Sequence, residues 1–346
     1  MRARVFVLAA LIGSTLAVVA RNAVHAATKL TTGPRQELPF GSFDYIVGTS
    51  KCDMAGNVYA RPVHLGAPAD ANFLAPIKKV APEGRTTGSF RLANAWEGWQ
   101  DSAARGIFVD GNGTLYQAAG GPGGVWAGGR GGAYVVTFAQ DGSVKSKTKL
   151  ETKTWVDPLH VAVFESGRLL ISGDSGEHTR TPYTAVFEAS GKLLKEIYEP
   201  EDEDARSKAV LGDTEFTNNS ERGNSFVWDA DVTLGSDGNA YLLHGTAPLV
   251  YAISPTGQVI RKMQIGVGGS ELAFRSIKPY HGQLAIGLAR FGHIEVHVTN
   301  LKGVPTDSYG MDTEGDVLEP ACYDSRGLTF ISAASHGGAY LLNAKP

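Results

Sequence analysis

The stretch Asp237–Ile265, "DGNAYLLHGTAPLVYAISPTGQVIRKMQI", contains two glycine turns, and an alternating apolar run follows each turn. Glycine tolerates the positive φ that tight hairpin turns require, and apolar alternation is typical of half-buried strands. The stretch therefore predicts short strands joined by tight turns.

Near-copies of this device recur along the chain. Six glycines close a turn directly before an apolar strand: Gly56, Gly113, Gly167, Gly238, Gly282 and Gly327. Five of these turns are followed 19 to 29 residues later by a second turn, at Gly84, Gly142, Gly191, Gly257 and Gly303. Each unit therefore supplies four strands, with one tight hairpin between the first two and another between the last two.

Units of 44 to 71 residues built from four strands match the blades of a β-propeller. Six blades close a ring, whereas a two-sheet sandwich does not need such even repetition. The sixth unit ends after its third strand, "AYLLNA", so we expect residues 27–40 to supply the fourth strand and close the ring. The sequence predicts an all-β, six-bladed propeller in which residues 27–346 form a single domain.

The first 26 residues have the pattern of a secretory signal peptide. Arg2 and Arg4 precede an uncharged run, and Val24-His25-Ala26 offers small residues at the positions that a signal peptidase reads. We therefore expect an exported protein, periplasmic or extracellular, with no membrane attachment after cleavage. An uncleaved anchor is the alternative.

Composition agrees with a glycine-rich β protein. The chain has 43 glycines and 42% hydrophobic residues. Removing the leader takes away three arginines, which leaves 29 basic against 35 acidic residues. This net negative charge argues against nucleic acid as a partner.

The repeats resemble the NHL-repeat family of six-bladed propellers, whose blades contain an apolar strand, Asp-x-x-Gly-Asn and a second glycine hairpin. The match covers the mature chain and is clearest around Asp53, Asp110 and Asp237. The resemblance implies the architecture and leaves the function open, because such propellers include lactonases, lyases and binding modules.

The two cysteines, Cys52 and Cys322, occupy neighbouring blades of the predicted ring. They precede equivalent aspartates by one and two residues, so they point to opposite faces of their strands. Opposite faces of neighbouring blades meet, and in an exported chain we expect a disulfide between blades 1 and 6. Two separate buried thiols are the alternative.

All long connections fall on the side of the disc opposite the tight hairpins, and loops often carry function. All five tryptophans lie in or beside these connections: Trp96, Trp99, Trp126, Trp155 and Trp228. Indole rings on a wet surface suit stacking on a sugar or gripping a peptide. The alternative is that they hold the loops onto the disc.

The inner strands begin on the same face with a ring of polar residues: Arg105, His160, Asp231, Arg275 and Glu319. As ion pairs they would neutralise one another and close the channel. As a substrate site, the two arginines would hold a carboxylate or phosphate, with His160, Asp231 or Glu319 as catalytic candidates.

A metal site is the third interpretation of the ring. Gluconolactonase-like propellers, to which the chain has a distant similarity, hold a divalent cation on the axis with acidic and amide side chains at these strand entries. The resemblance places Asp231 at one such aspartate position, with His160 and Glu319 as the other candidate ligands. Arg105 and His160 stand where amide ligands would be expected. An axial cation beside two arginines is electrostatically unfavourable, so a divalent cofactor is not favoured.

Two functions from different classes follow. The first is a secreted propeller that binds a small molecule, carbohydrate, peptide or protein through Trp99, Trp126, Trp155 and Trp228, with Arg105 and Arg275 beneath them. The second is a hydrolase or lyase, lactonase-like, that acts at the mouth of the central channel. The sequence leaves open which of them is right.

Overall fold

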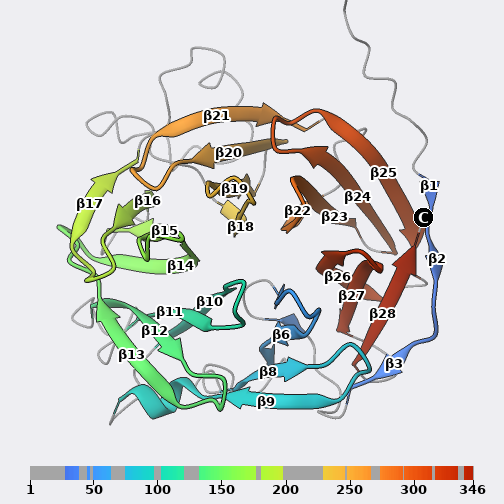
Figure 1. Cartoon of the computed structure of the whole chain (residues 1–346), viewed down its shortest axis with the longest axis horizontal. Coiled ribbons are helices and arrows are strands. Elements are labelled where there is room, and N and C mark those ends of the chain that lie inside the picture. Colours follow the sequence, from blue (N-terminus) through green and yellow to red (C-terminus); the bar gives the residue numbers. More distant parts are fainter. Residues whose placement is uncertain are drawn as a thin grey trace, which may run out of the picture.

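The computed structural model describes residues 28–38, 45–46, 50–63, 75–96, 103–120, 132–176, 181–197, 229–245, 248–265, 273–290, 292–313, 316–333 and 339–345. Within these ranges the strands form six blades arranged in a ring around a central axis (Figure 1). The predicted leader lies outside the described residues. The six-bladed, all-β prediction is confirmed.

Blades 1 to 3 each have four antiparallel strands, ordered from the axis outward. Blade 1 contains β5 (Lys51–Cys52), β6 (Val58–Ala60), β8 (Ile77–Val80) and β9 (Thr86–Phe90). Blade 2 contains β10 (Ala103–Val109), β11 (Leu115–Gly120), β12 (Ala133–Phe138) and β13 (Val144–Lys149). Blade 3 contains β14 (Val156–Val163), β15 (Leu169–Ser175), β16 (Thr181–Phe187) and β17 (Leu193–Glu196).

Blades 4 to 6 complete the ring. Blade 4 contains β18 (Asp229–Leu234), β19 (Ala240–His244), β20 (Leu249–Ile253) and β21 (Val259–Gln264). Blade 5 contains β22 (Ala273–Tyr280), β23 (Gln283–Arg290), β24 (His293–Asn300) and β25 (Pro305–Asp312). The chain supplies blade 6 with β26 (Val317–Asp324), β27 (Gly327–Ala333) and β28 (Tyr340–Lys345). A short sheet of β4 (Tyr45–Ile46) with β7 (Pro62–Val63) and the 3₁₀ helix η1 (Leu92–Ala95) lie outside this scheme.

The N-terminal segment closes the ring, as predicted. Strands β2 (Thr31–Thr32) and β3 (Gln36–Glu37) pair antiparallel with β28 and serve as the fourth strand of blade 6. Before them, β1 (Thr28–Lys29) pairs parallel with β25 of blade 5, a pairing that the sequence did not predict. In Figure 1 these three strands run along the outer edge of the two last blades. We call residues 28–38 the N-terminal strap.

The turn glycines have the backbone conformation that the repeat analysis required. All eleven have positive φ, from 74° at Gly257 to 111° at Gly327. An aspartate supports several of the first hairpins: Asp110 Oδ1, for example, accepts hydrogen bonds from the backbone N–H groups of Asn112 and Thr114, both at 2.9 Å. Such side-chain turns explain why Asp precedes the glycine in the repeat.

The second hairpin of each blade packs on the outer strand of the preceding blade. A Cβ at Gly142 would lie 2.5 Å from the carbonyl oxygen of Ser89 in β9, and a Cβ at Gly191 would lie 1.9 Å from that of Lys149 in β13. At the ring closure, Gly84 approaches the carbonyl of Glu37 in the strap at 3.4 Å from its Cβ position. The strap therefore takes the place of an outer strand in this contact too.

The hydrophobic core lies between the blades. Apolar side chains of one sheet face pack against the next blade, as where Val296 of β24 joins Leu318 and Phe330 of blade 6 in one buried cluster. In the described part of the chain no helix is long and apolar enough to span a membrane.

Candidate functional site

The predicted polar ring lies on five inner strands, Arg105 on β10, His160 on β14, Asp231 on β18, Arg275 on β22 and Glu319 on β26. Each of these strands shifts register against its neighbour at or beside the ring residue. Such bulges bend a strand and change the direction of its side chains. Pro158 and Pro320 fit here because a bulge tolerates a residue without an N–H group. The side chain of Arg275 lies outside the described part of the structure.

Arg105 forms an ion pair with Asp157, a residue on the neighbouring blade. Its Nε and Nη2 donate to Asp157 Oδ1 and Oδ2 at 2.7 and 2.8 Å. The two side chains are 13% and 1% exposed, so the pair is largely shielded from water. This two-pronged geometry already satisfies the carboxylate, and it occupies the guanidinium edge that a substrate anion would use.

Asp231 is the centre of a second charge network at the axis. It has no exposed surface, and its Oδ1 accepts hydrogen bonds from Lys51 Nζ and from Val232 N at 2.8 Å. Its Oδ2 accepts from Ile277 N at 3.0 Å and from Lys278 Nζ at 3.3 Å. Blades 1, 4 and 5 therefore meet at one carboxylate.

Burial and charge shift the pKa values of this network in ways that keep it ionised. Burial by itself would raise the pKa of Asp231, but the ammonium groups of Lys278 and Lys51 outweigh it and hold that pKa well below its usual range. Burial lowers the pKa of Lys51 to about 8, against the opposing effect of Asp231. Near neutral pH both groups remain charged.

Glu319 joins the inner strands of blades 6 and 1. Its Oε1 accepts hydrogen bonds from Ser50 N at 2.7 Å and from Ser50 Oγ at 3.0 Å. Lys278 Nζ donates to the carbonyl oxygen of the same serine. Burial raises the pKa of Glu319, although Lys278 and the bonds from Ser50 oppose this.

His160 lies between the two networks. It is half-buried on β14, opposite Ser172 of β15. It lies within electrostatic range of the Asp231 carboxyl group. The structure thus groups His160, Asp231 and Glu319 around the axis, together with lysines that the prediction did not include.

Sequence reasoning missed Asp157, Ser50, Lys51 and Lys278. A signal for Lys51 and Lys278 was present, because each places a charge on an inner strand, beside a cysteine in β5 and between Ile277 and Pro279 in β22. Asp157 lies three residues before His160, on the far side of a bulge. That bulge breaks the alternation from which the ring was predicted.

The ring does not fit a divalent axial cation. Lys51, Lys278 and backbone N–H groups already engage both oxygens of Asp231, and the two ammonium groups repel a cation. Among the residues that the structure describes, no three His, Cys, Asp or Glu side chains are grouped so as to hold a metal ion.

The structure describes two of the five tryptophans, Trp96 and Trp155. Trp96 has a structural role, because its ring packs edge-to-face on Tyr134 with centroids 5.2 Å apart, and Lys147 Nζ lies 4.7 Å from its centroid. Trp155 is half-buried immediately before β14, two residues from Asp157. The other three candidates, Trp99, Trp126 and Trp228, lie outside the described residues.

The two cysteines meet between blades 1 and 6, as their positions in the repeat predict. Cys52 and Cys322 belong to one buried cluster and their thiols are close enough to share a hydrogen bond. Both are free in this structure. Burial, together with Cys52, raises the pKa of the Cys322 thiol.

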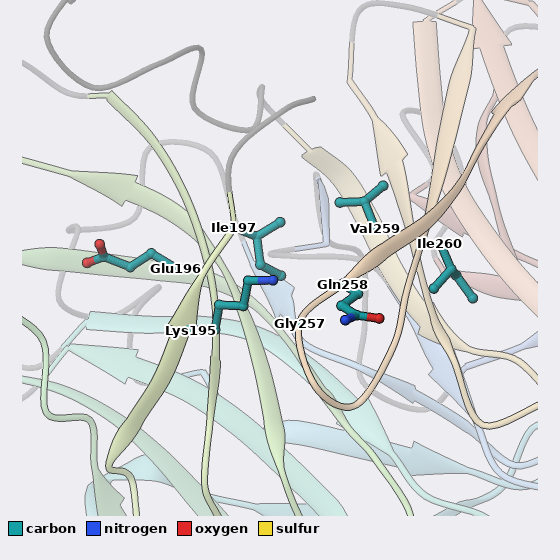
Figure 2. A pocket seen from close by; sticks show the side chains of 7 residues that line it. All are labelled: Lys195, Glu196, Ile197, Gly257, Gln258, Val259 and Ile260. Carbon is teal, nitrogen blue, oxygen red and sulfur yellow. The ribbon is translucent and has the colours of Figure 1, made fainter. Parts of the chain in front are cut away.

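A groove on the outer rim lies apart from the channel. Figure 2 shows Lys195, Glu196 and Ile197 at the end of β17 facing the hairpin that joins β20 to β21. The groove has a volume of about 480 Å³ and shares no residue with the polar ring.

Solved structures with the same architecture cover nearly the whole chain. A calcium-binding protein, regucalcin, from Agrobacterium tumefaciens str. C58 superposes with a TM-score of 0.53 at 13% identity, over 92% of this chain and 95% of that one. A streptogramin B lyase superposes with a TM-score of 0.50 at 12% identity, over 91% of this chain and 98% of that one. The fold is that of a six-bladed β-propeller.

No family model matches the sequence of this propeller, and no curated protein matches it either. At 12 to 13% identity the likeness concerns the fold alone. The function of the propeller therefore has to be inferred from its own side chains.

Proposed function

We propose that this protein is an exported β-propeller that binds a ligand, namely a carbohydrate, a peptide or a partner protein, on the face that carries the long connections. One observation carries the choice of binding over catalysis. Three charged side chains of the ring are each engaged by another group of the chain: Arg105 by Asp157, Asp231 by two lysines and Glu319 by Ser50. General acid–base chemistry needs a group that can exchange a proton with substrate, and these groups are committed to one another.

Trp155 supports the choice of face. It is half-buried immediately before an inner strand, two residues along the chain from Asp157, the partner of Arg105. An aromatic wall with a fixed polar edge is a common arrangement in sites for sugars and peptides. Trp99, Trp126 and Trp228 are the further contacts that the sequence predicts on this face.

The test is a binding screen with matched tryptophan variants. Wild-type fluorescence is followed during titration with neutral and acidic oligosaccharides, lactones and short peptides, and hits are measured by calorimetry. We expect Trp155→Ala and Trp126→Ala to weaken binding by about tenfold or more. Trp96→Phe should bind normally, because the ring of Trp96 packs against Tyr134 of blade 2.

The same screen distinguishes the alternative. Turnover of a lactone or another panel member that is lost in His160→Gln, with binding retained, would replace the proposal by a hydrolase or lyase at the channel mouth. If no member of the panel is bound or turned over, both functions are contradicted.

Export is part of the proposal, and it has its own test. The intact mass of the protein from an exporting host should correspond to a chain that begins near Ala27. A membrane-bound product that retains residues 1–26 would contradict cleavage.

A further inference from the structure

The ammonium group of Lys51 lies among oxygen atoms at the axis. Lys51 extends from blade 1 to the opposite blade 4, where Nζ contacts Asp231 Oδ1 and lies 2.6 Å from the carbonyl oxygen of Val232. The side chain is 8% exposed and Asp231 is fully buried. A carboxylate and a backbone carbonyl oxygen are the donors that hard metal cations use.

The surroundings of the Lys51 ammonium group suit a monovalent cation better than a divalent one. Val232 N holds Asp231 Oδ1 from the other side at 2.8 Å, so the carboxylate is oriented by the strand on which it lies. Lys278, at 3.3 Å from Asp231 Oδ2, adds a second positive charge that a divalent ion would meet at close range. The Glu319 carboxylate faces Ser50 and not Lys51.

We propose that Lys51 is the built-in axial cation of this propeller: its ammonium group takes the place beside the Asp231 carboxylate and the Val232 carbonyl oxygen that a bound metal cation would need. The channel is then closed by the chain itself, and blade 1, whose inner strand β5 has two residues, is tied across the axis to blade 4. The inference is independent of what the loop face binds.

Chemical rescue tests this assignment. Lys51→Ala removes three methylene groups and the ammonium group, which together correspond to n-propylammonium. We expect the Tm of Lys51→Ala to fall by about 5 °C or more, because a buried carboxylate loses a partner. Added n-propylammonium should restore Tm in a saturable way, whereas n-propanol should not, and the double variant Lys51→Ala/Asp231→Asn should not respond.

The wild-type protein supplies an arm that does not depend on the variant folding. Its Tm should be the same in calcium, in manganese and in a chelator. A saturable rise of Tm with either metal that Asp231→Asn abolishes would overturn the proposal, as would a Lys51→Ala protein as stable as wild type or one that n-propanol rescues equally. If Lys51→Ala does not fold, Lys51→Met, which keeps the packing without the charge, should fold with a Tm about 5 °C or more below that of wild type.

Discussion

At the scale of single residues, the inner strands carry charges that an apolar strand would not normally bury. Asp157 and Asp231 are tolerated because a guanidinium group and two ammonium groups reach them from other blades. Removing one member of such a pair leaves a buried charge uncompensated, which costs more than removing both. A double substitution that is less destabilising than the single one therefore shows that two residues form a pair.

The Arg105–Asp157 pair gives the first prediction. Asp157→Leu should lower the free energy of unfolding by about 3 kcal/mol, because Arg105 is left largely buried beside an apolar group. Arg105→Met combined with Asp157→Leu should recover part of that loss in urea unfolding. A double variant that is less stable than Asp157→Leu would show that the two residues do not act as a pair.

His244 gives the second prediction, on pH. Burial, with a contribution from Lys262, lowers its pKa from 6.5 to about 4 in the folded protein. Between these values the unfolded chain binds more protons than the folded one, so stability is complete above pH 6.5 and falls as the pH drops towards 4. The loss attributable to His244 is about 3 kcal/mol at most.

The measurement compares wild type with His244→Gln across pH 4 to 7. The variant should lose less stability than wild type over this range, since glutamine does not titrate there. Carboxyl groups such as Glu319 titrate in both proteins and cancel in the difference. Parallel curves for the two proteins would refute the role of His244.

At the scale of elements, the second hairpin of a blade joins it to the blade before. Its glycine has two separate requirements, a positive φ and space for the neighbouring outer strand. Gly191 has both, with φ of 90° and a Cβ position 1.9 Å from the carbonyl oxygen of Lys149. Gly238, in a first hairpin, has φ of 76° and nothing within 4 Å of its Cβ position.

These two glycines give the third prediction. Gly238→Ala should cost about 1 kcal/mol, the strain of alanine at positive φ. Gly191→Ala should cost distinctly more, because the added methyl group forces β13 and the hairpin apart. Chemical denaturation of both variants measures the difference. Equal losses in the free energy of unfolding would mean that the contact between blades 2 and 3 accommodates the methyl group without a measurable cost.

At the scale of the whole molecule, the strap pairs with β28 in blade 6 and contacts the second hairpin of blade 1. The strap buries Leu38 at the seam between blades 6 and 1, at 6% exposure, and Leu30 between blades 5 and 6, at 4% exposure. Cys52 and Cys322 contact each other nearer the axis. Opening the ring requires both contacts to separate.

The fourth prediction rests on the proposed export: in an oxidising compartment, oxidation joins these two thiols. Each thiol loses a proton and an electron to a disulfide oxidant of that compartment, whose own disulfide is reduced to two thiols. The bond closes a loop of most of the chain, and the loop-entropy estimate for such a bond is about 4 to 5 kcal/mol. A reductant should therefore lower the Tm of wild type and leave that of Cys52→Ser unchanged. Two free thiols in the protein purified from an oxidising host would contradict the bond.

The sequence by itself determined the number of blades and the positions of the turns, because a tight hairpin needs a glycine wherever φ is positive and the same need repeats in every unit. It also placed Cys52 against Cys322, because strand alternation within a repeat fixes which faces meet. Tertiary structure decided the partners at the axis. Lys51 and Asp231 are 180 residues apart, and bulges in the inner strands interrupt the alternation from which side-chain directions are predicted. Which charge compensates which therefore depends on how six strands converge in space.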